Sequence, residues 1–222
     1  MTTLPSAHIR GIVFDLDGTL YVCNPFADAI QETANIYIAD LLGIKKEQAF
    51  QLMTDTRARL TEESGTVQTL SSVCAELGGN IRELHRYFEE RLQPEAYLVR
   101  DERVVHLMQR LAEHFPLYIY TNNNRALATR IINHLGLEGL FRGIFAIDDA
   151  WRSKPDEQML AGIMAETGLA PAEALFVGDR YDVDLRVPEQ YGCPVYLSRT
   201  VEQLLRLGDL LGGRGAGIKY AR

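Results

Sequence analysis

Two aspartates follow directly on a short apolar run near the start of the chain. The stretch GIVFDLDGTLY, residues 11–21, places Asp15 and Asp17 one residue apart. Carboxylates held close together repel each other, and burying them costs free energy unless a cation or a hydrogen-bond donor compensates. The pair therefore predicts a compensating partner elsewhere in the chain.

Further polar residues follow other apolar runs of the chain. They are Thr121 and Asn122 after LYIY (117–120), Lys154 in the loop after GIFAI (143–147), and Asp179 after ALFVG (174–178), with Asp182 and Asp184 close behind. If these runs are strands of one parallel sheet, the polar residues meet at its carboxyl edge, where ligands of open α/β sheets bind.

Each of these residues has a structural explanation when it is taken alone. The alternatives are a plain turn at Asp17-Gly18, a helix N-cap at Thr121 or at the NNN of 122–124, a solvated surface position for Lys154, and the first turn of a helix for Asp182 and Asp184. These explanations do not account for the position of all the residues at the same end of successive strands. Their joint occurrence indicates a site.

A divalent cation is the partner that explains the acidic residues. Asp15 and Asp179 would offer two carboxylates, and the backbone carbonyl of Asp17, waters and a substrate oxygen would complete six oxygen ligands, which suits Mg²⁺. A metal that bridges a carboxylate and a phosphate removes much of the repulsion between the two anions. The residues thus predict phosphoryl chemistry.

In this chemistry each carboxylate has its own task. Asp15 would attack phosphorus and form an aspartyl-phosphate, while Asp17 would protonate the departing alkoxide and then take a proton from the hydrolytic water. The phosphoryl oxygens would be bound by the Thr121 hydroxyl, the Asn122 backbone N–H and the Lys154 ammonium. Asp184 would orient Lys154 or a metal-bound water.

The elements that must position these residues can be read from the apolar pattern. Continuously apolar runs at 11–14, 117–120, 143–147, 174–178 and 194–197 are typical of parallel strands covered on both faces. Segments with helical periodicity at 101–115 and 125–137 alternate with them, and Gly136 suits the C-terminal end of the second. We predict an α/β fold with a Rossmann-like, three-layer core around a parallel sheet.

The interval from about residue 22 to residue 98 contains no strand candidate but several helical stripes. We therefore predict a discontinuous core of residues 1–21 and 99–222, with residues 22–98 inserted as a helical cap over the carboxyl end of the sheet. The glycine-rich tail, residues 212–222, is expected to be flexible.

Composition excludes several other classes of protein. The 222-residue chain is 46% hydrophobic and 24% charged with a formal net charge of -7, and it has no basic run of the kind that binds nucleic acid. No apolar window is long enough to span a membrane, and the N-terminus lacks the pattern of a signal peptide. The three cysteines have no disulfide or metal spacing, so a cytoplasmic location is expected.

The combined pattern resembles the haloacid dehalogenase superfamily of hydrolases. Its four motifs read here VFDLDGT (13–19), YTN (120–122), KP (154–155) and VGDRYDVD (177–184), and the helical interval looks like a C1-type cap. The resemblance implies Asp15 as nucleophile, Asp17 as acid/base, Mg²⁺ held by Asp15, the Asp17 carbonyl and Asp179, and phosphate contacts from Thr121 and Lys154. Arg180 departs from the small hydroxyl residue that many members carry there, and Asp182 has no assigned role.

Within this superfamily the retained Asp17 and Asp179 favour phosphatases, since the carbon–halogen hydrolases lack the second aspartate. The cap is similar in size to those of phosphoglycolate phosphatases and nucleoside 5′-monophosphate phosphatases, so a small phosphorylated metabolite is the expected substrate. A haloacid dehalogenase-type hydrolase and a non-catalytic phospho-accepting domain are the alternatives. The oligomeric state, monomer or dimer, stays open.

Four residues are candidates for reading the leaving group, because the loop after the first motif and the second cap helix commonly face the site in this family. They are Tyr21, Asn24, Arg57 and Arg59. For the two arginines, a solvated position on an amphipathic helix is the competing interpretation.

Overall fold

The computed structural model of the protein describes residues 8–212 and contains a five-stranded sheet in the order β3-β2-β1-β4-β5, with all neighbouring strands parallel. The strands are β1 (Gly11–Phe14), β2 (Leu117–Tyr120), β3 (Phe141–Phe145), β4 (Ala174–Gly178) and β5 (Val195–Leu197). The predicted parallel α/β architecture is confirmed.

The third strand begins and ends two residues earlier than the apolar run at 143–147 suggested. Phe141 already pairs with Leu117 across the sheet, whereas Ile147 begins the short 3-10 helix η3 (Ile147–Asp149). The Ile147 N–H bonds to the carbonyl of Asn123, so the chain has left the ladder there. Apolar residues continue beyond the strand because Ala146 and Ile147 are also buried.

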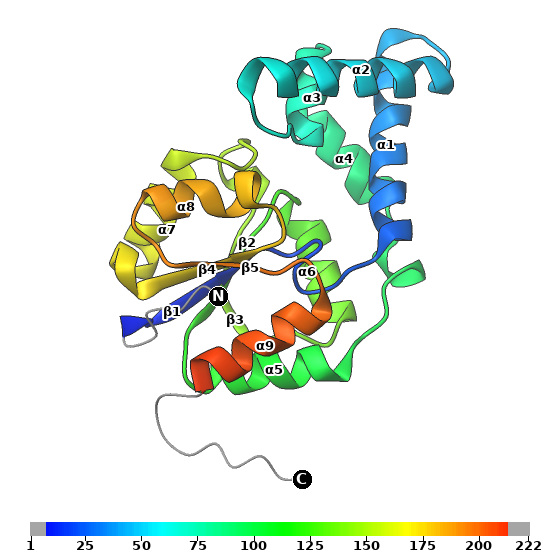
Figure 1. Ribbon diagram of the computed structural model, residues 1–222. Coiled ribbons are helices and arrows are strands. Elements are labelled where there is room, and N and C mark those ends of the chain that lie inside the picture. Colours follow the sequence, from blue (N-terminus) through cyan, green and yellow to red (C-terminus); the bar gives the residue numbers. More distant parts are fainter. Residues whose placement is uncertain (1–7, 213–222) are drawn as a thin grey trace.

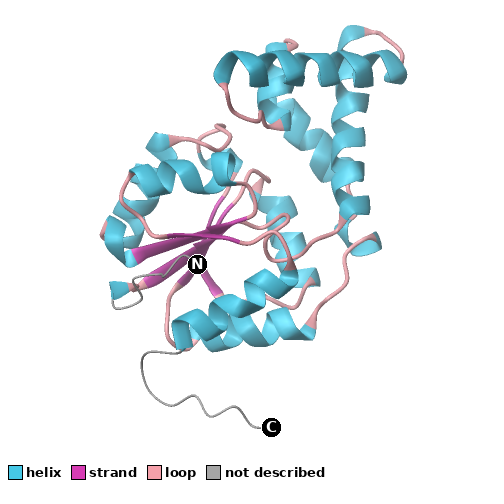
Figure 2. Ribbon diagram, viewed as in Figure 1, coloured by secondary structure: helices cyan, strands magenta, loops and turns pink. Residues whose placement is uncertain are grey.

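Helices cover both faces of the sheet, which gives three layers (Figure 2). One face packs against α5 (Glu102–Ala112), α6 (Arg125–His134) and α9 (Val201–Gly212), and the other against α7 (Glu157–Thr167) and α8 (Arg186–Gln190). Ile12 and Phe14 of β1 belong to the first core and Val13 to the second. Side chains that alternate between two buried faces explain why the strands read as continuously apolar.

Four helices are inserted between β1 and β2 (Figure 1). They are α1 (Asn24–Leu42), α2 (Lys46–Ser64), α3 (Leu70–Glu76) and α4 (Ile81–Arg91), followed by the 3-10 helix η2 (Pro94–Ala96). All lie within the interval 22–98, and below we call this interval the cap. Its apolar interior is continuous with the core under the sheet, since Phe26 and Leu84 join the same buried cluster as Phe14.

The ends of α6 show how the sequence defines a helix next to the site. The Asn124 side chain accepts a hydrogen bond from the Leu127 N–H at 2.8 Å, so the last asparagine of NNN is the N-cap. The helix ends at His134, and Gly136 follows with a φ of 71°, a left-handed conformation that glycine adopts without strain.

Two further findings concern the ends and the length of the helices. Residues 213–222 of the expected flexible tail lie outside the described residues, and Gly212 ends α9. Across residues 8–212 the longest apolar helical stretches fall short of what a membrane span requires.

The central strand β2 provides a test of the core. Ile119 is fully buried between β1 and β3, so Ile119→Ala should lower the free energy of unfolding by about 2–5 kcal/mol through lost burial and the cavity left behind. Val99→Ala is the control, because Val99 is 82% exposed and its replacement should change stability by less than about 0.5 kcal/mol. Urea titrations of both variants measure the difference, and equal effects would contradict this packing.

Candidate active site

The predicted site residues converge at β1, where the order in which strands are added to the parallel sheet changes side. Strand β1 lies between β2 and β4, and the strands numbered after β1 are added on opposite sides of it. The Asp15 N–H extends the ladder to the Val177 carbonyl at 2.8 Å, and the Thr121 N–H does the same to Phe145 at 2.9 Å. Asp15 and Thr121 thus leave their strands side by side, at the kind of crevice where open α/β sheets bind ligands.

The ammonium group of Lys154 is the centre of this arrangement. It donates to Asp15 Oδ1 at 2.6 Å, to Asp184 Oδ1 at 2.7 Å and to the Tyr120 carbonyl at 2.9 Å. These contacts use all three of its hydrogens, and the side chain is 1% exposed. The lysine that alone suggested a surface position is therefore a buried cation between two carboxylates.

The position of Lys154 is fixed through its backbone as well. Its N–H donates to Asn122 Oδ1 at 2.7 Å, which ties the loop after β3 to the loop after β2. The Asn122 side chain thereby has a structural contact in addition to the phosphate contact predicted for its backbone.

One ammonium cannot neutralise all the carboxylates around it. Burial raises the pKa of Asp15 to about 7, and Asp184 and Asp179 add to this shift although Lys154 opposes it. Burial and Asp184 likewise raise the pKa of Asp179 to about 6. For Asp184, burial is outweighed by Lys154 and Arg180, which hold its pKa below the usual value. The site therefore carries an excess of negative charge.

This excess fits a divalent cation. Three carboxylate oxygens, one from each of Asp15, Asp179 and Asp184, lie within 4.8 Å of one another. Asp179 Oδ1 is buried and has no hydrogen-bond partner among the described residues. A cluster of hard oxygen donors with one acceptor left unsatisfied is the kind of set that Mg²⁺ binds. Asp184, expected only to orient neighbours, lies close enough to join the cluster while it also holds Lys154.

The second aspartate of the first motif points to a different set of partners. Asp17 Oδ2 accepts from Asn123 Nδ2 at 2.7 Å, and Asp17 Oδ1 accepts from the Tyr21 hydroxyl. The Asn123 N–H in turn donates to Thr121 Oγ1 at 3.1 Å. Asp17 is thus held apart from the cluster of the other three carboxylates by two neutral donors.

Two of these contacts were not assigned from the sequence. Asn123 stands in the NNN run, but only Asn122 was given a role. Tyr21 is predicted to read the leaving group, and in the structure its hydroxyl also donates to Asp17. Burial, followed by the charge of Asp17, raises the pKa of Tyr21. The sequence signal for both residues is their position: Tyr21 follows the motif VFDLDGT by two residues, and Asn123 comes directly after the motif YTN.

Two glycines allow the loops to approach each other. Gly18 has a φ of 83°, and a Cβ there would lie 2.5 Å from Asp179 Oδ2. A Cβ on Gly178 would lie 2.5 Å from the Asp184 Cβ. Both contacts are shorter than van der Waals distance, so a side chain at either position would push apart the aspartates of the cluster.

A cavity of about 710 Å³ lies above these residues, between the core and the cap. Asp17, Asn122 and Asp179 line it from the core, and Asn24 is among the residues that line it from the cap. Asp15, Thr121, Lys154 and Asp184 are at most 5% exposed and are not among its lining residues. The structure therefore places the most buried predicted residues below the cavity floor.

Neither cap arginine is among the residues that line this cavity. Arg57 is half-buried and donates from Nη2 to Gln31 Oε1 at 3.0 Å. Arg59 is exposed and forms ion pairs with Glu63 and Glu76. The structure thus does not bring the two arginines together with the other predicted site residues.

Arg180 lies beside the carboxylate cluster and lines the cavity. Its Nε is 3.7 Å from Asp179 Oδ1 and 3.9 Å from Asp184 Oδ2, and its backbone N–H donates to Asp184 Oδ2 at 3.0 Å. The unusual residue of the fourth motif therefore supplies part of the positive charge that the cluster needs. Asp182 also lines the cavity, 3.9 Å from Arg186 Nε.

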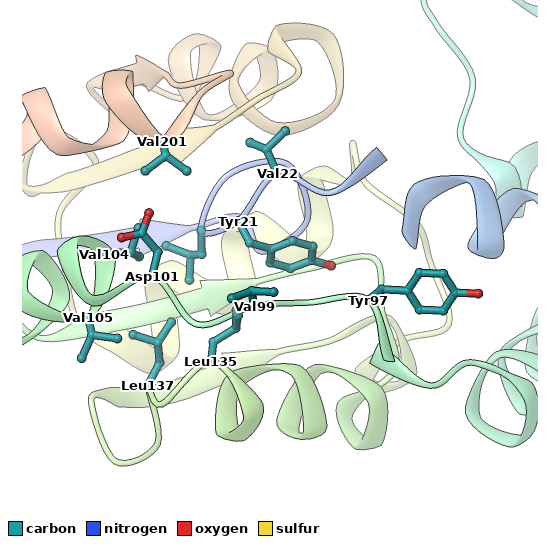
Figure 3. Close-up of a pocket in the computed structure, with 11 residues that line it drawn as sticks. Tyr21, Val22, Tyr97, Val99, Asp101, Val104, Val105, Leu135, Leu137 and Val201 are labelled. Atoms are coloured by element: carbon teal, nitrogen blue, oxygen red, sulfur yellow. The ribbon is translucent and has the colours of Figure 1, made fainter. Parts of the chain in front are cut away.

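Tyr21 and Val22 also line a second, smaller hollow of about 220 Å³ (Figure 3). Its lining is mostly aliphatic, with Tyr97 and Val99 from the segment that returns from the cap to the core. Asp101 is the one charged residue in its lining, and it is engaged as the N-cap of α5 and in an ion pair with Arg103. Among the described residues, the groups suited to chemistry belong to the larger cavity.

Comparison with known proteins points to the same family as the four sequence motifs. The family model for haloacid dehalogenase-like hydrolases matches residues 9–192. A phosphoglycolate phosphatase of Shigella boydii is 28% identical over 203 residues, which cover 84% of this chain and 79% of that protein.

Solved structures share the fold. The magnesium-bound HAD-hydrolase YfnB of Bacillus subtilis superposes with a TM-score of 0.59 at 18% identity, covering 92% of this chain and 99% of that one. A 2-haloacid dehalogenase of Pseudomonas syringae pv. Tomato superposes with a TM-score of 0.58 at 19% identity, covering 93% and 100%. Since the fold is common to phosphatases and dehalogenases, the choice between them depends on the site.

The charge balance of the site predicts how metal and pH act together on stability. In the metal-free protein, Asp15 and Asp179 have raised pKa values, so their protonated forms favour the native state and stability should fall as the pH rises from about 4 to about 7. The stability that the lowered pKa of Asp184 contributes is fully present above about pH 4 and is lost only as the pH falls below that value. Because a metal needs the deprotonated carboxylates, added Mg²⁺ should stabilise the protein more at about pH 8 than at about pH 5. A hundredfold excess of Mg²⁺ over its Kd at pH 8 should raise the free energy of unfolding by about 2.7 kcal/mol over that of the metal-free protein.

Urea titrations at the two pH values, with Mg²⁺ and with a chelator, measure this effect. Melting curves that do not respond to millimolar Mg²⁺ at either pH would contradict a metal site at the cluster.

Proposed function

The chain belongs to the haloacid dehalogenase-like hydrolases, and from this membership we propose that it is a Mg²⁺-dependent hydrolase of small phosphate monoesters. The observation that carries the proposal is the separation of two carboxylates. Asp15 lies within the acidic cluster, and Asp17 is held by the neutral donors Asn123 and Tyr21. Two carboxylates in different environments can act as nucleophile and as proton carrier.

Asp15 is the proposed nucleophile. Its Oδ1 accepts from Lys154 and its Oδ2 from the Thr19 hydroxyl at 2.9 Å, so both oxygens are oriented and each keeps a free lone pair. Attack on phosphorus forms a bond from the carboxylate oxygen, and the bond to the leaving alkoxide breaks. The product is an aspartyl-phosphate on Asp15.

Asp17 is the proposed general acid and base. Protonated, it gives its proton to the alkoxide as that group departs, and ionised, it takes a proton from the water that hydrolyses the aspartyl-phosphate. The hydrogen bonds from Asn123 and Tyr21 fix the direction of the carboxyl group through both steps.

The proposed metal ligands are Asp15, Asp179 and the backbone carbonyl of Asp17, with the Asp184 carboxylate close enough to contribute. A bound Mg²⁺ would supply positive charge that lets an anionic carboxylate approach an anionic phosphate. The phosphoryl oxygens are assigned to the Thr121 hydroxyl, the Asn122 N–H and Lys154. Since all three Lys154 hydrogens are already used, a phosphate contact requires one of them to change partner.

We also propose that residues 22–98 act as a cap domain that selects the leaving group. Asn24 and Tyr21 line the cavity, which supports their assignment to this function. Arg57 and Arg59 stay proposed contacts for an anionic or polar leaving group, and the half-buried Arg57 is the better placed of the two, because Arg59 is engaged by two glutamates.

Three other functions are the alternatives to this proposal. A nucleoside 5′-monophosphate phosphatase would use the same mechanism on a larger leaving group. Dehalogenation would need no proton carrier for an alkoxide, so the fixed position of Asp17 supports phosphoryl transfer instead. A phospho-accepting domain would keep its acyl-phosphate, whereas Asp17 lies two residues from Asp15 on the same loop.

A screen of phosphorylated metabolites, with Mg²⁺ and with a chelator, tests the reaction class. We expect Mg²⁺-dependent release of inorganic phosphate from at least one monoester. If no monoester is hydrolysed under either condition, the proposed function is wrong.

The nucleophile assignment predicts the effect of a single isosteric change. Asp15→Asn should abolish phosphate release because the amide is not a nucleophile, while far-UV circular dichroism should show an intact fold. Asp55→Asn, on the exposed face of α2, is the matched control and should retain full activity. Turnover by Asp15→Asn would remove the assignment.

The role of Asp17 predicts a different kind of defect. Asp17→Asn should slow turnover by about 10²–10⁴-fold, because the proton needed by the leaving group and the base needed by the water are both lost. With a substrate whose leaving group needs no proton, such as p-nitrophenyl phosphate, the first step should suffer less and the aspartyl-phosphate should accumulate. Acid quench with a ³²P-labelled ester detects it, and an unchanged rate for alkyl phosphates would argue against the role.

A further inference from the structure

The two sides of the substrate cavity differ in charge. The core side carries Asp17, Asp179, Arg180, Asp182 and Arg199. The cap side, within the described residues, has no aspartate, glutamate, lysine or arginine in its lining. Its residues are Val22, Cys23, Asn24, Phe26, Ala27, Ile30, Val67, Thr69, Leu70, Ser71, His85 and Phe88. A leaving group that reaches toward the cap therefore meets an apolar wall with a few neutral polar groups.

The most distinctive polar group on this wall is His85 of α4. It is 1% exposed, its Nε2 lies 3.4 Å from Ser71 Oγ, and its Nδ1 is buried with no hydrogen-bond partner among the described residues. A buried ring nitrogen without a partner costs free energy, and a ligand that supplies the partner recovers it. His85 thus resembles a recognition group more than a packing residue.

Its surroundings hold the ring in a fixed place. The ring packs edge-on against Phe88, with centroids 5.2 Å apart, and against Trp151 of the core at 6.3 Å. The His85 carbonyl accepts from Asn124 Nδ2 at 2.9 Å, and this asparagine follows the predicted phosphate-binding residues. Burial lowers the pKa of His85 to about 4, so the imidazole is neutral near pH 7.

We propose that the leaving group of the substrate is uncharged and bears a hydroxyl that hydrogen-bonds to the His85–Ser71 pair, as in the phosphate ester of a polyol or sugar. This inference rests on the proposed phosphatase function and specifies its substrate class. A neutral imidazole and a serine hydroxyl each offer a donor and an acceptor, which match a hydroxyl. A carboxylate only accepts, and it would lose its hydration against this wall without gaining a cation.

The size of the cavity supports the same class. Its volume of about 710 Å³ lies within the range of small-molecule sites, and Ile30, Val67 and Leu70, none of which is buried, give it an apolar surface. A two-carbon leaving group such as glycolate would leave most of this surface uncovered. The carbon frame of a longer polyol or sugar can cover it while its hydroxyls reach Ser71 and His85.

Arg180 and Arg199 lie on the core side, so an anionic leaving group held against the cap side would require a cation from the cap, and Arg57 is the candidate. Its Nε is buried without a partner among the described residues, but its Nη2 donates to Gln31 and the residue is not part of the lining. Recognition of a carboxylate would therefore need Arg57 to leave Gln31 and enter the cavity. This alternative defines the opposite outcome of the test.

The experiment compares three groups of esters under the same Mg²⁺ conditions. They are sugar and polyol phosphates (ribose 5-phosphate, glucose 6-phosphate, sorbitol 6-phosphate), carboxylate-bearing phosphates (2-phosphoglycolate, 3-phosphoglycerate) and phenyl phosphate, which has no polar group to recognise. Each is measured with the native enzyme, with His85→Phe, Ser71→Ala and Arg57→Ala, and with the control Asp55→Asn. The phenylalanine side chain in His85→Phe keeps an aromatic ring in contact with Phe88 and Trp151 and removes the two ring nitrogens of His85.

We expect the native enzyme to have its highest kcat/KM on a sugar or polyol phosphate. His85→Phe should lower kcat/KM for that ester about tenfold more than for phenyl phosphate, mainly through KM, as is typical of one lost hydrogen bond. Ser71→Ala should shift the same ratio in the same direction. Asp55→Asn, on the exposed face of α2 and outside the cavity lining, is the control and should leave the ratio between the two esters within about twofold.

Two results would overturn the inference while the proposed function stands. One is a preference for 2-phosphoglycolate or 3-phosphoglycerate that Arg57→Ala abolishes. The other is an equal loss on all esters in His85→Phe and Ser71→Ala, which indicates a structural role. If His85→Phe does not fold, calorimetric binding of the preferred ester to Asp15→Asn, with and without Ser71→Ala, replaces it, and equal affinities count against the proposal. Absence of any Mg²⁺-dependent hydrolysis by the native enzyme would instead refute the proposed function.

Discussion

The buried ammonium of Lys154 is the interaction on which the site depends. It joins the end of β1 through Asp15, the end of β2 through the Tyr120 carbonyl and the segment after β4 through Asp184. Removing one partner from a buried ion pair leaves an uncompensated charge and typically costs about 3–5 kcal/mol. A single cation thereby fixes the relative positions of three loops that are far apart in sequence.

The same cation leaves the site incompletely neutralised. Asp15, Asp179 and Asp184 share one buried ammonium and a partly exposed guanidinium, whose Nε stays beyond hydrogen-bond distance of the carboxylates. In a region of low dielectric such an excess of negative charge is costly, and it is relieved by protonation or by a divalent ion. Burial, together with the neighbouring carboxylates, raises the pKa values of Asp15 and Asp179. The same two conditions favour a divalent ion at the proposed metal site.

Much of this arrangement could be predicted from the sequence because parallel strands align their carboxyl ends. A polar residue after each apolar run was enough to bring Asp15, Thr121, Lys154 and Asp179 to one edge. What could not be predicted depends on side-chain direction. The choice of Asn123 as the partner of Asp17 is set by the turn after β2, and the contact of Arg57 with Gln31 is set by the packing of α2 on α1. His85 occurs in the amphipathic helix IRELHRYFEER, where local pattern gives no reason to expect an unpartnered ring nitrogen.

The difference in charge between the two sides of the cavity fits the proposed function. Every phosphate monoester would present the same dianionic phosphoryl group, so charged residues are needed only on the core side, where the reaction is proposed to occur. The cap would meet only the variable part of the substrate, and its uncharged wall would lower the dielectric above the site and strengthen the electrostatic interactions beneath it. Asn124 joins the two sides, because its side-chain Oδ1 accepts from the Leu127 N–H at the start of α6 and its Nδ2 donates to the His85 carbonyl. The position of His85 is in this way tied to the loop that is proposed to bind the phosphate.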